Sequence, residues 1–292
     1  RAAGTSLNKT NMTSREPAMT KKIALGLSLV LMAALLAGLY WFDQLFEDPR
    51  AEFLPSLTAR LGVERVMFVG AHPDDEQLVT GLLVQAEREG LQSYMLTATK
   101  GEKGEQYPVI ARKVDQAVIR QAETLKNSFA LGVEAHDVLD FPDGYLQQGH
   151  AEALVAAVRE RLLRWRPDLL VSFWPESGFS NHPDHMQMGM AVEAAAQQLA
   201  SAPVDGYAGP RFIAYALAPT HALATFGGER GQQVITHQPA PDFAIDGAGW
   251  AKIRGWDIHA SQAGFVQADY GMPAWLIHRI YDKEFYRVLP PD

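Results

Sequence analysis

The stretch RVMFVGAHPDDEQLVTGLLVQAEREG (residues 65–90) decides how this chain folds. Its first seven residues form a mostly apolar run rich in β-formers, which is typical of a buried parallel strand. From residue 75 onward the apolar residues recur at helical spacing, and Gly90 marks the end of a helix. A histidine, a proline and three acids separate the strand from the helix. The stretch therefore predicts a strand, a polar junction and a helix.

The polar junction has two interpretations. Pro73 fits the first position of a helix, where its missing N–H costs nothing. Asp74, Asp75 and Glu76 would then lie in the first turn, where the helix dipole favours negative charge. On this interpretation the junction has no role beyond favouring the start of the helix. The other interpretation is a metal site, and the rest of the chain has to decide between the two.

Strands and helices alternate from residue 65 to about residue 218. Helical patterns separate the expected strands, which cover residues 65–71, 91–99, 137–141, 168–174 and 211–218. This alternation predicts an α/β fold with a mostly parallel sheet. Residues 247–262 look helical, whereas residues 220–246 and the last thirty residues give no clear pattern.

The tripeptide His-Pro-Asp occurs twice, at residues 72–74 and 182–184, each time after a predicted strand and before a predicted helix. In open α/β sheets, ligands bind beyond the carboxyl ends of the strands, so segments far apart in sequence converge there. A helix that only needed a cap would more often use Ser, Thr, Asp or Asn than histidine. The pair of tripeptides therefore favours the metal site over the helix start.

A catalytic zinc site uses three protein ligands and keeps one position for water. His72 and Asp75 are three residues apart, so one helical turn brings them to one side, and His185 supplies a third ligand from the second segment. Asp74 then suits the role of general base. His182 is placed to face a carbonyl oxygen, and Asp184 to hold the ring of His182.

The motifs AHPDDE (71–76) and HPDH (182–185) resemble the PIG-L/LmbE family of zinc-dependent N-acetylglucosaminyl de-N-acetylases. The resemblance runs from about residue 66 to residue 262 and includes TKGEKGE (99–105), RQAE (120–123), LGV (131–133), FPDG (141–144) and KIRGWDIHASQ (252–262). It implies a Rossmann-like fold and hydrolysis of an amide on an N-acetylglucosaminyl-type conjugate.

The resemblance also implies a role for each matching residue. His72, Asp75 and His185 correspond to the ligands of Zn²⁺, with Fe²⁺ as an alternative metal in the cell. Asp74 corresponds to the base, His182 to the oxyanion stabiliser and Asp184 to its support. Arg120 and Asp143 match positions that contact the sugar. Some family members have a tyrosine where this chain has Ser180, so a second oxyanion donor is missing or comes from elsewhere.

Residues 23–42 contain no charge, and twenty residues of helix cover roughly 30 Å, the thickness of a bilayer core. Lys21 and Lys22 precede this run and acids follow it, which predicts a single-span anchor with an exported C-terminal domain, in a bacterial inner membrane with the domain in the periplasm. A cleaved signal peptide is the competing interpretation. Residues 1–22 are expected to be a disordered polar leader, and residues 60–292 the deacetylase domain.

Charge and cysteine content exclude several kinds of function. Five basic side chains and one acidic side chain give residues 1–22 a net charge of +4, so the total of −8 leaves −12 for residues 43–292. An acidic domain of this kind is a poor nucleic-acid binder. The chain has no cysteine, which excludes disulfides, thiolate metal sites and cysteine nucleophiles.

The sequence leaves three functions open. The first is hydrolysis of the acetamide of an N-acetylated sugar conjugate, releasing acetate and a free amine. The second is a membrane-tethered sugar-binding protein without catalysis, although the expected ligands and base are all present. The third is a hydrolase that acts on a different amide or on a lipid-linked glycan.

Overall fold

The computed structural model describes residues 17–290, and the chain divides into two compact units, residues 1–43 and 44–292. The first unit consists of α1 (Pro17–Gln44), a helix that begins six residues before the apolar run. Its residues 21–44 have a mean hydropathy of 2.3, and by length and composition this helix is apolar enough to cross a membrane. Of the expected polar leader, residues 1–16 lie outside the described residues.

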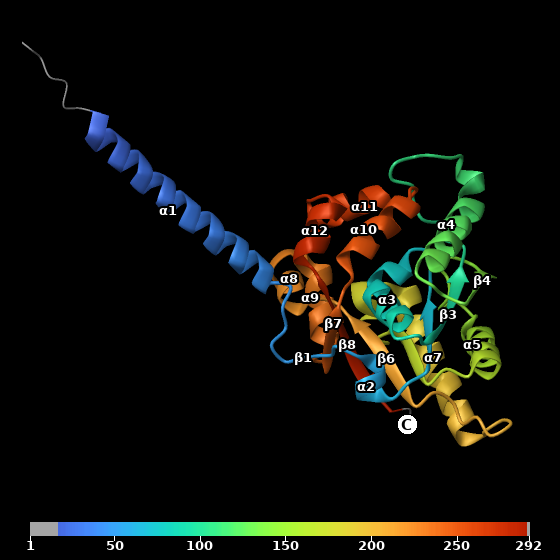
Figure 1. Cartoon of the computed structure of the whole chain (residues 1–292). Helices are drawn as coiled ribbons and strands as arrows, with labels where there is room; N and C mark the ends of the chain where they lie inside the picture. Colours follow the sequence, from blue (N-terminus) through green and yellow to red (C-terminus); the bar gives the residue numbers. More distant parts are fainter. Residues whose placement is uncertain (1–16, 291–292) are drawn as a thin grey trace, which may run out of the picture. The chain divides into compact units, whose positions relative to one another are not determined.

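The second unit is built on one eight-stranded sheet (Figure 1), whose strand order is β1-β7-β8-β6-β5-β2-β3-β4. The strands are β1 (Glu52–Phe53), β2 (Arg65–Gly70), β3 (Gln92–Thr99), β4 (Ala135–Phe141), β5 (Leu169–Phe173), β6 (Phe212–Leu217), β7 (Phe243–Asp246) and β8 (Lys283–Leu289). Strands β2 to β6 are mutually parallel, whereas β8 runs antiparallel to both β6 and β7. The sheet is therefore mixed, with the predicted parallel part at its centre.

Helices cover both faces of the sheet. One layer contains α3 (Thr80–Arg88), α4 (Gln116–Ala130) and α10 (Gly249–Ile258), and the other contains α5 (Ala151–Trp165) and α7 (Pro183–Ser201). The remaining short elements are α2 (Leu57–Leu61), η1 (Asp75–Leu78), η2 (Lys113–Asp115), α6 (Gly178–Asn181), α8 (Thr220–Phe226), α9 (Gly228–His237), α11 (Ala263–Tyr270) and α12 (Ala274–Ile280).

Two regions without a clear sequence pattern form regular elements. Residues 220–246 form α8, α9 and β7, and the last thirty residues contain α11, α12 and β8. Their helices are only seven to ten residues long. Such short elements carry too few periodic residues to be recognised by pattern, and packing against the sheet stabilises them instead.

The two central strands explain where the functional residues meet. In β2 and β5 the apolar side chains from residue 66 to residue 69 and from residue 169 to residue 171 are no more than 1% exposed. The chain proceeds from β2 towards β3 and β4 on one side, and from β5 towards β6 on the other. The strand order reverses between β2 and β5, and in open α/β sheets the crevice at such a point binds the ligand.

Candidate metal centre

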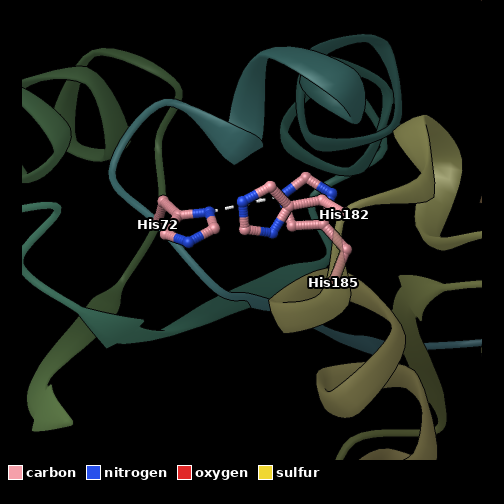
Figure 2. A group of neighbouring side chains, drawn as sticks. All are labelled: His72, His182 and His185. Carbon is pink, nitrogen blue, oxygen red and sulfur yellow. Dashed lines mark hydrogen bonds between the residues drawn. The ribbon is translucent and has the colours of Figure 1, made fainter. Parts of the chain in front are cut away.

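The two His-Pro-Asp segments leave the sheet at the carboxyl ends of β2 and β5 and meet there. The imidazoles of His72, His182 and His185 lie side by side (Figure 2), with ring centroids 4.9 to 5.2 Å apart. His72 follows β2, whereas His182 and His185 stand at the start of α7. Segments more than a hundred residues apart therefore form one cluster, as the strand ends predicted.

Asp75 fixes the loop that carries His72. Its Oδ2 accepts hydrogen bonds from the backbone N–H groups of Ala71, at 2.7 Å, and His72, at 2.9 Å. The other oxygen, Oδ1, lies 3.1 Å from Nε2 of His185. One oxygen of Asp75 thus holds the loop, and the other points towards the second segment.

In both His72 and His185, the ring nitrogen that points away from the other histidine lies close to a hydrogen-bond acceptor. His72 Nε2 lies 3.2 Å from Asp143 Oδ1 and 3.3 Å from Asp184 Oδ2. His185 Nδ1 lies 2.9 Å from the carbonyl oxygen of Gly178, and the His185 ring stacks on Phe173 at 4.2 Å. In the neutral rings these contacts place the protons on His72 Nε2 and His185 Nδ1.

The inner nitrogens, His72 Nδ1 and His185 Nε2, then carry lone pairs and face each other at 3.2 Å (Figure 2). Four ligands at about 2.0–2.1 Å from a tetrahedral zinc lie about 3.3–3.4 Å from one another. The separations of 3.2 Å and 3.1 Å among His72, His185 and Asp75 are close to this spacing. The third separation is longer, because His72 Nδ1 lies 3.9 Å from Asp75 Oδ2. His72, His182 and His185 also bring three ligand atoms within 4.8 Å of one another, as do His72, Asp143 and Asp184. The cluster therefore offers donors for a divalent cation, and the ligand set of His72, Asp75 and His185 stays a prediction.

The same atoms perturb one another's ionisation. Burial lowers the pKa of His72, but the surrounding carboxylates of Asp143, Asp184 and Asp75 raise it well above its usual value. Burial raises the pKa of Asp75, yet the neighbouring imidazoles, His185 foremost, bring it well below its usual value. A cluster of this kind stabilises positive charge, whether a proton or a metal ion brings it.

Asp143 and Asp184 both place a carboxylate oxygen against Nε2 of His72. The carboxylate of Asp184 also accepts from the N–H groups of Gly144 and Leu146, and the contact of Asp184 with the His182 ring comes from its backbone N–H. The oxygen Oδ2 of Asp143 accepts from the N–H of Lys103 at 2.8 Å, while Oδ1 faces His72. A sugar contact of Asp143 stays a prediction.

His182 caps helix α7. Its φ of −86° and ψ of 126° are extended, and its Nδ1 accepts the N–H of Asp184 at 3.2 Å. Burial, followed by the charges of His185 and His72, lowers the pKa of His182 to about 4. The ring is neutral at neutral pH, and because Nδ1 is an acceptor, Nε2 carries the proton. His182 is thus a neutral hydrogen-bond donor beside the cluster.

Asp74 has a backbone conformation that few residues adopt. Its φ is +96°, in the left-handed region, and its Oδ2 accepts a 3.0 Å hydrogen bond from Arg120. A non-glycine residue held in such a conformation costs on the order of 1–3 kcal/mol, and strain of this kind clusters at functional sites. Desolvation raises the pKa of Asp74, against the opposing charge of Arg120.

Arg120 joins three segments beneath the site. Its guanidinium donates to the carbonyl oxygens of Pro73 and Gly101 as well as to Asp74, and the residue is buried. Gly101 has a φ of +67°, and a side chain there would collide with Arg120. Glu123, one turn further along α4, accepts hydrogen bonds from the backbone and the side chain of Ser261.

The sequence did not reveal the partners of Glu76. This carboxylate is fully buried and accepts hydrogen bonds from Thr124, Asn127 and the backbone N–H of Asp74, and Nε2 of His259 lies 2.5 Å away. Although burial raises the pKa of Glu76, the charge of His259 leads the effects that bring it to about 2. A run of three acids after a proline was the available signal, but it equally described a helix start.

Comparison with known proteins points to one family. Residues 67–196 match the model of the PIG-L family, described as GlcNAc-PI de-N-acetylase. A Corynebacterium urealyticum protein named 1D-myo-inositol 2-acetamido-2-deoxy-alpha-D-glucopyranoside deacetylase is 31% identical over 191 residues, 55% of each chain. A protein of the same name from Kineococcus radiotolerans is 32% identical over 174 residues, 50% of this chain and 47% of its own. The chain spans about half the length of these curated relatives.

Solved structures share the fold. The N,N'-diacetylchitobiose deacetylase of Pyrococcus horikoshii superposes with a TM-score of 0.61 at 19% identity, covering 80% of this chain and 87% of its own. The 4-carboxy-2-hydroxymuconate hydratase GalB of Pseudomonas putida gives 0.56 at 16% identity, covering 78% and 97%. A deacetylase and a hydratase therefore share this architecture, and the residues of the site must decide the chemistry.

Proposed function

We propose that this chain hydrolyses the acetamide of an N-acetylglucosaminyl-type glycan or glycolipid, because its residues 67–196 match the PIG-L family model. The products are acetate and a free amine. One observation carries the proposal: Nδ1 of His72 and Nε2 of His185 face each other, and Oδ1 of Asp75 lies 3.1 Å from the latter, which is close to the spacing of ligands around one cation. The names of the curated relatives, which act on a 2-acetamido-2-deoxyglucopyranoside, support the substrate class.

We propose that the cation is zinc, held by His72, Asp75 and His185, with Fe²⁺ as the alternative. Nitrogen and carboxylate ligands suit both metals, and three protein ligands leave a position for substrate. When bound, the cation supplies Lewis-acid activation of water and of the acetamide carbonyl. Asp143 and Asp184 hold the ring of His72 in the tautomer that leaves Nδ1 free for the cation.

Asp74 is the general base in this proposal. It takes a proton from the attacking water and delivers it to the amine as the C–N bond breaks, so the water is divided between acetate and amine. The raised pKa of Asp74 brings it nearer to the range in which one carboxyl group both accepts and returns a proton. Arg120 holds Asp74 in place, and we assign it this positioning role in preference to a sugar contact.

His182 donates its Nε2–H to the oxygen of the former carbonyl as negative charge develops there. The donor is neutral and fixed by its capping bond to the N–H of Asp184, so it needs little reorganisation during the reaction. A donor of this kind is typically worth about 10²–10³ in kcat. The chain has Ser180 where some relatives have a tyrosine, so His182 carries more of this stabilisation.

We propose that α1 anchors the enzyme in a bacterial inner membrane with the catalytic unit in the periplasm. The length and hydropathy of α1 and the lysines before it support this topology. A cleaved signal sequence has the same features. Reporters fused after Asp292 test the topology, because a periplasmic reporter should be active and a cytosolic one inactive.

The activity is tested on the purified full chain, stripped with a chelator and reloaded with Zn²⁺ or Fe²⁺. Incubation with N-acetylated glycans and glycolipids should produce acetate and a product lighter by about 42 Da in the metal-loaded protein only. His185→Ala is the control, since it removes one ligand. Metal bound at one ion per chain without acetate release from any of these substrates would favour the sugar-binding protein instead.

A further inference from the structure

Helix α4 buries its polar side chains and exposes apolar ones, which is the reverse of the usual arrangement. Its buried residues are all polar or charged: Gln116, Arg120, Glu123, Thr124, Asn127 and Ser128. Its exposed residues include Val118 at 71%, Leu125 at 38% and Phe129 at 84%, together with Ala122. In a soluble domain the apolar stripe of a helix normally faces the core. The outer face of α4, defined by these four residues, faces outward instead.

The apolar surface continues beyond the helix. Val114, four residues before Val118 and one turn earlier, is 80% exposed. In the loop that leads to it, Tyr107, Val109 and Ile110 are 54%, 80% and 49% exposed. The backbone of Tyr107 is bonded to Ser261 and Gly264, so this part of the loop is held to the body of the domain. An apolar surface built from a packed helix and a fixed loop marks a contact with a partner.

The charges beside this surface indicate which partner it meets. Residues 100–130 carry six basic and four acidic side chains, a net charge of +2, whereas residues 43–292 as a whole carry −12. Lys126 is exposed next to the apolar residues. Arg112 and Lys113 are exposed there as well, although Arg112 pairs with Asp115 and Lys113 donates to the carbonyl oxygens of Lys103 and Gly104. In a two-fold dimer this surface would meet itself, and cations would face cations. An anionic lipid surface offers apolar chains and negative headgroups together.

We propose that the outer face of α4 and the loop of residues 107–110 dock on an anionic membrane surface. The apolar side chains enter the boundary between headgroups and acyl chains, and the flanking cations meet the phosphates. Since Arg120, Thr124 and Asn127 on the inner face of α4 bond to Asp74 and Glu76, the docked helix is also the helix that supports the site. This contact is additional to any anchoring by α1 and independent of the reaction catalysed.

The experiment uses single spin labels, which the absence of native cysteine makes possible. Ala122→Cys places a nitroxide on the outer face of α4, and Ala156→Cys, an exposed alanine on α5 in the other helix layer, is the matched control. The full chain is reconstituted into vesicles of phosphatidylethanolamine and phosphatidylglycerol, and into pure phosphatidylcholine vesicles. Accessibility of each label to oxygen and to a water-soluble nickel chelate is measured by electron paramagnetic resonance.

The oxygen-to-nickel ratio at residue 122 should exceed that at residue 156 several-fold, and should be larger with phosphatidylglycerol than without it. Phe129→Glu in the Ala122→Cys background should return the ratio towards that of the control while leaving the circular dichroism spectrum unchanged, because residue 129 is exposed. Equal nickel accessibility at both positions would overturn the proposal. So would spin–spin broadening at residue 122 with low accessibility to both reagents, which would identify a second copy as the partner.

Discussion

The two copies of His-Pro-Asp consist of the same three residues, but their side chains make different contacts and have different roles. In the first copy the histidine faces the second segment through its lone-pair nitrogen, and Asp74 stands at a φ of +96° against Arg120. In the second copy His182 caps a nineteen-residue helix, and Asp184 reaches across to orient His72 of the first copy. The aspartate of one copy thus serves the histidine of the other.

The backbone after each proline causes this difference. Pro183 occupies the first turn of α7, so Asp184 continues the helix and its carboxylate is buried. After Pro73 the chain takes a left-handed residue and a short 3₁₀ turn before α3 begins at Thr80. That detour turns Asp75 back towards the N–H groups of Ala71 and His72. A tripeptide therefore fixes which groups are present, and the local backbone decides what each group does.

Among the variants that test the difference between the two His-Pro-Asp segments, Asp74→Asn should have the largest effect. Asparagine tolerates the left-handed conformation of residue 74, so the loop should keep its shape while the base is lost. We expect kcat to fall by about 10²–10⁴, the range that general bases contribute. Metal content, measured by mass spectrometry of the purified protein, should stay at the wild-type value. Turnover at the wild-type rate would remove Asp74 from the mechanism.

His182→Asn separates the two tasks of the second histidine. Asparagine is a good N-cap, so α7 should keep its start, but the Nε2–H donor is gone. We expect kcat to fall by about 10²–10³ with an unchanged midpoint of thermal unfolding. His182→Ala should lose as much activity and, in addition, about 1 kcal/mol of stability from the missing cap. Equal stability of the two variants would contradict the capping role.

Much of the fold and the meeting of the two segments follow from sequence. The apolar runs at residues 65–71 and 168–174 predicted buried parallel strands, and strand ends of parallel sheets lie at one edge. The carboxylates that contact Nε2 of His72 did not follow from the sequence, because Asp143 and Asp184 lie 71 and 112 residues further along the chain. The partnership of Glu76 with His259 spans 183 residues and was equally hidden. Periodicity predicts local structure, whereas such contacts depend on how the whole sheet assembles.

Asp184→Asn tests whether the second aspartate serves the first histidine. Asparagine keeps one acceptor oxygen, so it accepts from only one of the N–H groups of Gly144 and Leu146, and without the negative charge it holds His72 less firmly. Loss of a group that orients a ligand typically lowers metal affinity by 10–100-fold. Competition with a fluorescent zinc chelator measures this affinity, and turnover should recover at saturating zinc. If affinity stayed the same while kcat fell even at saturating zinc, Asp184 would act on the reaction rather than on His72.

The smallest expected effect concerns the pH dependence of stability in the chelated protein. The pKa of His182 is lowered to about 4, whereas the pKa of His72 is raised well above its usual value. An unfolded histidine takes up its proton near pH 6.5, so between about pH 6.5 and 4 the unfolded chain binds the His182 proton and the folded chain does not. This residue therefore destabilises the fold as the pH falls through that window.

His72 has the opposite sign, since its contribution is present at low pH and is lost as the pH rises through its raised folded-state pKa. His136 and His278, with pKa values lowered to about 4 and about 3, act in the same direction as His182. The measurement is thus a difference: urea unfolding of chelated wild type and chelated His182→Asn at about pH 6.5 and 4.5. The variant should lose less stability on acidification. It lacks the imidazole of His182, which the folded protein keeps unprotonated, whereas the contribution of His72 is the same in both proteins. Identical losses of stability in the two proteins would mean that His182 accepts a proton as readily in the folded state as in the unfolded chain. The lowered pKa of His182 would then be wrong.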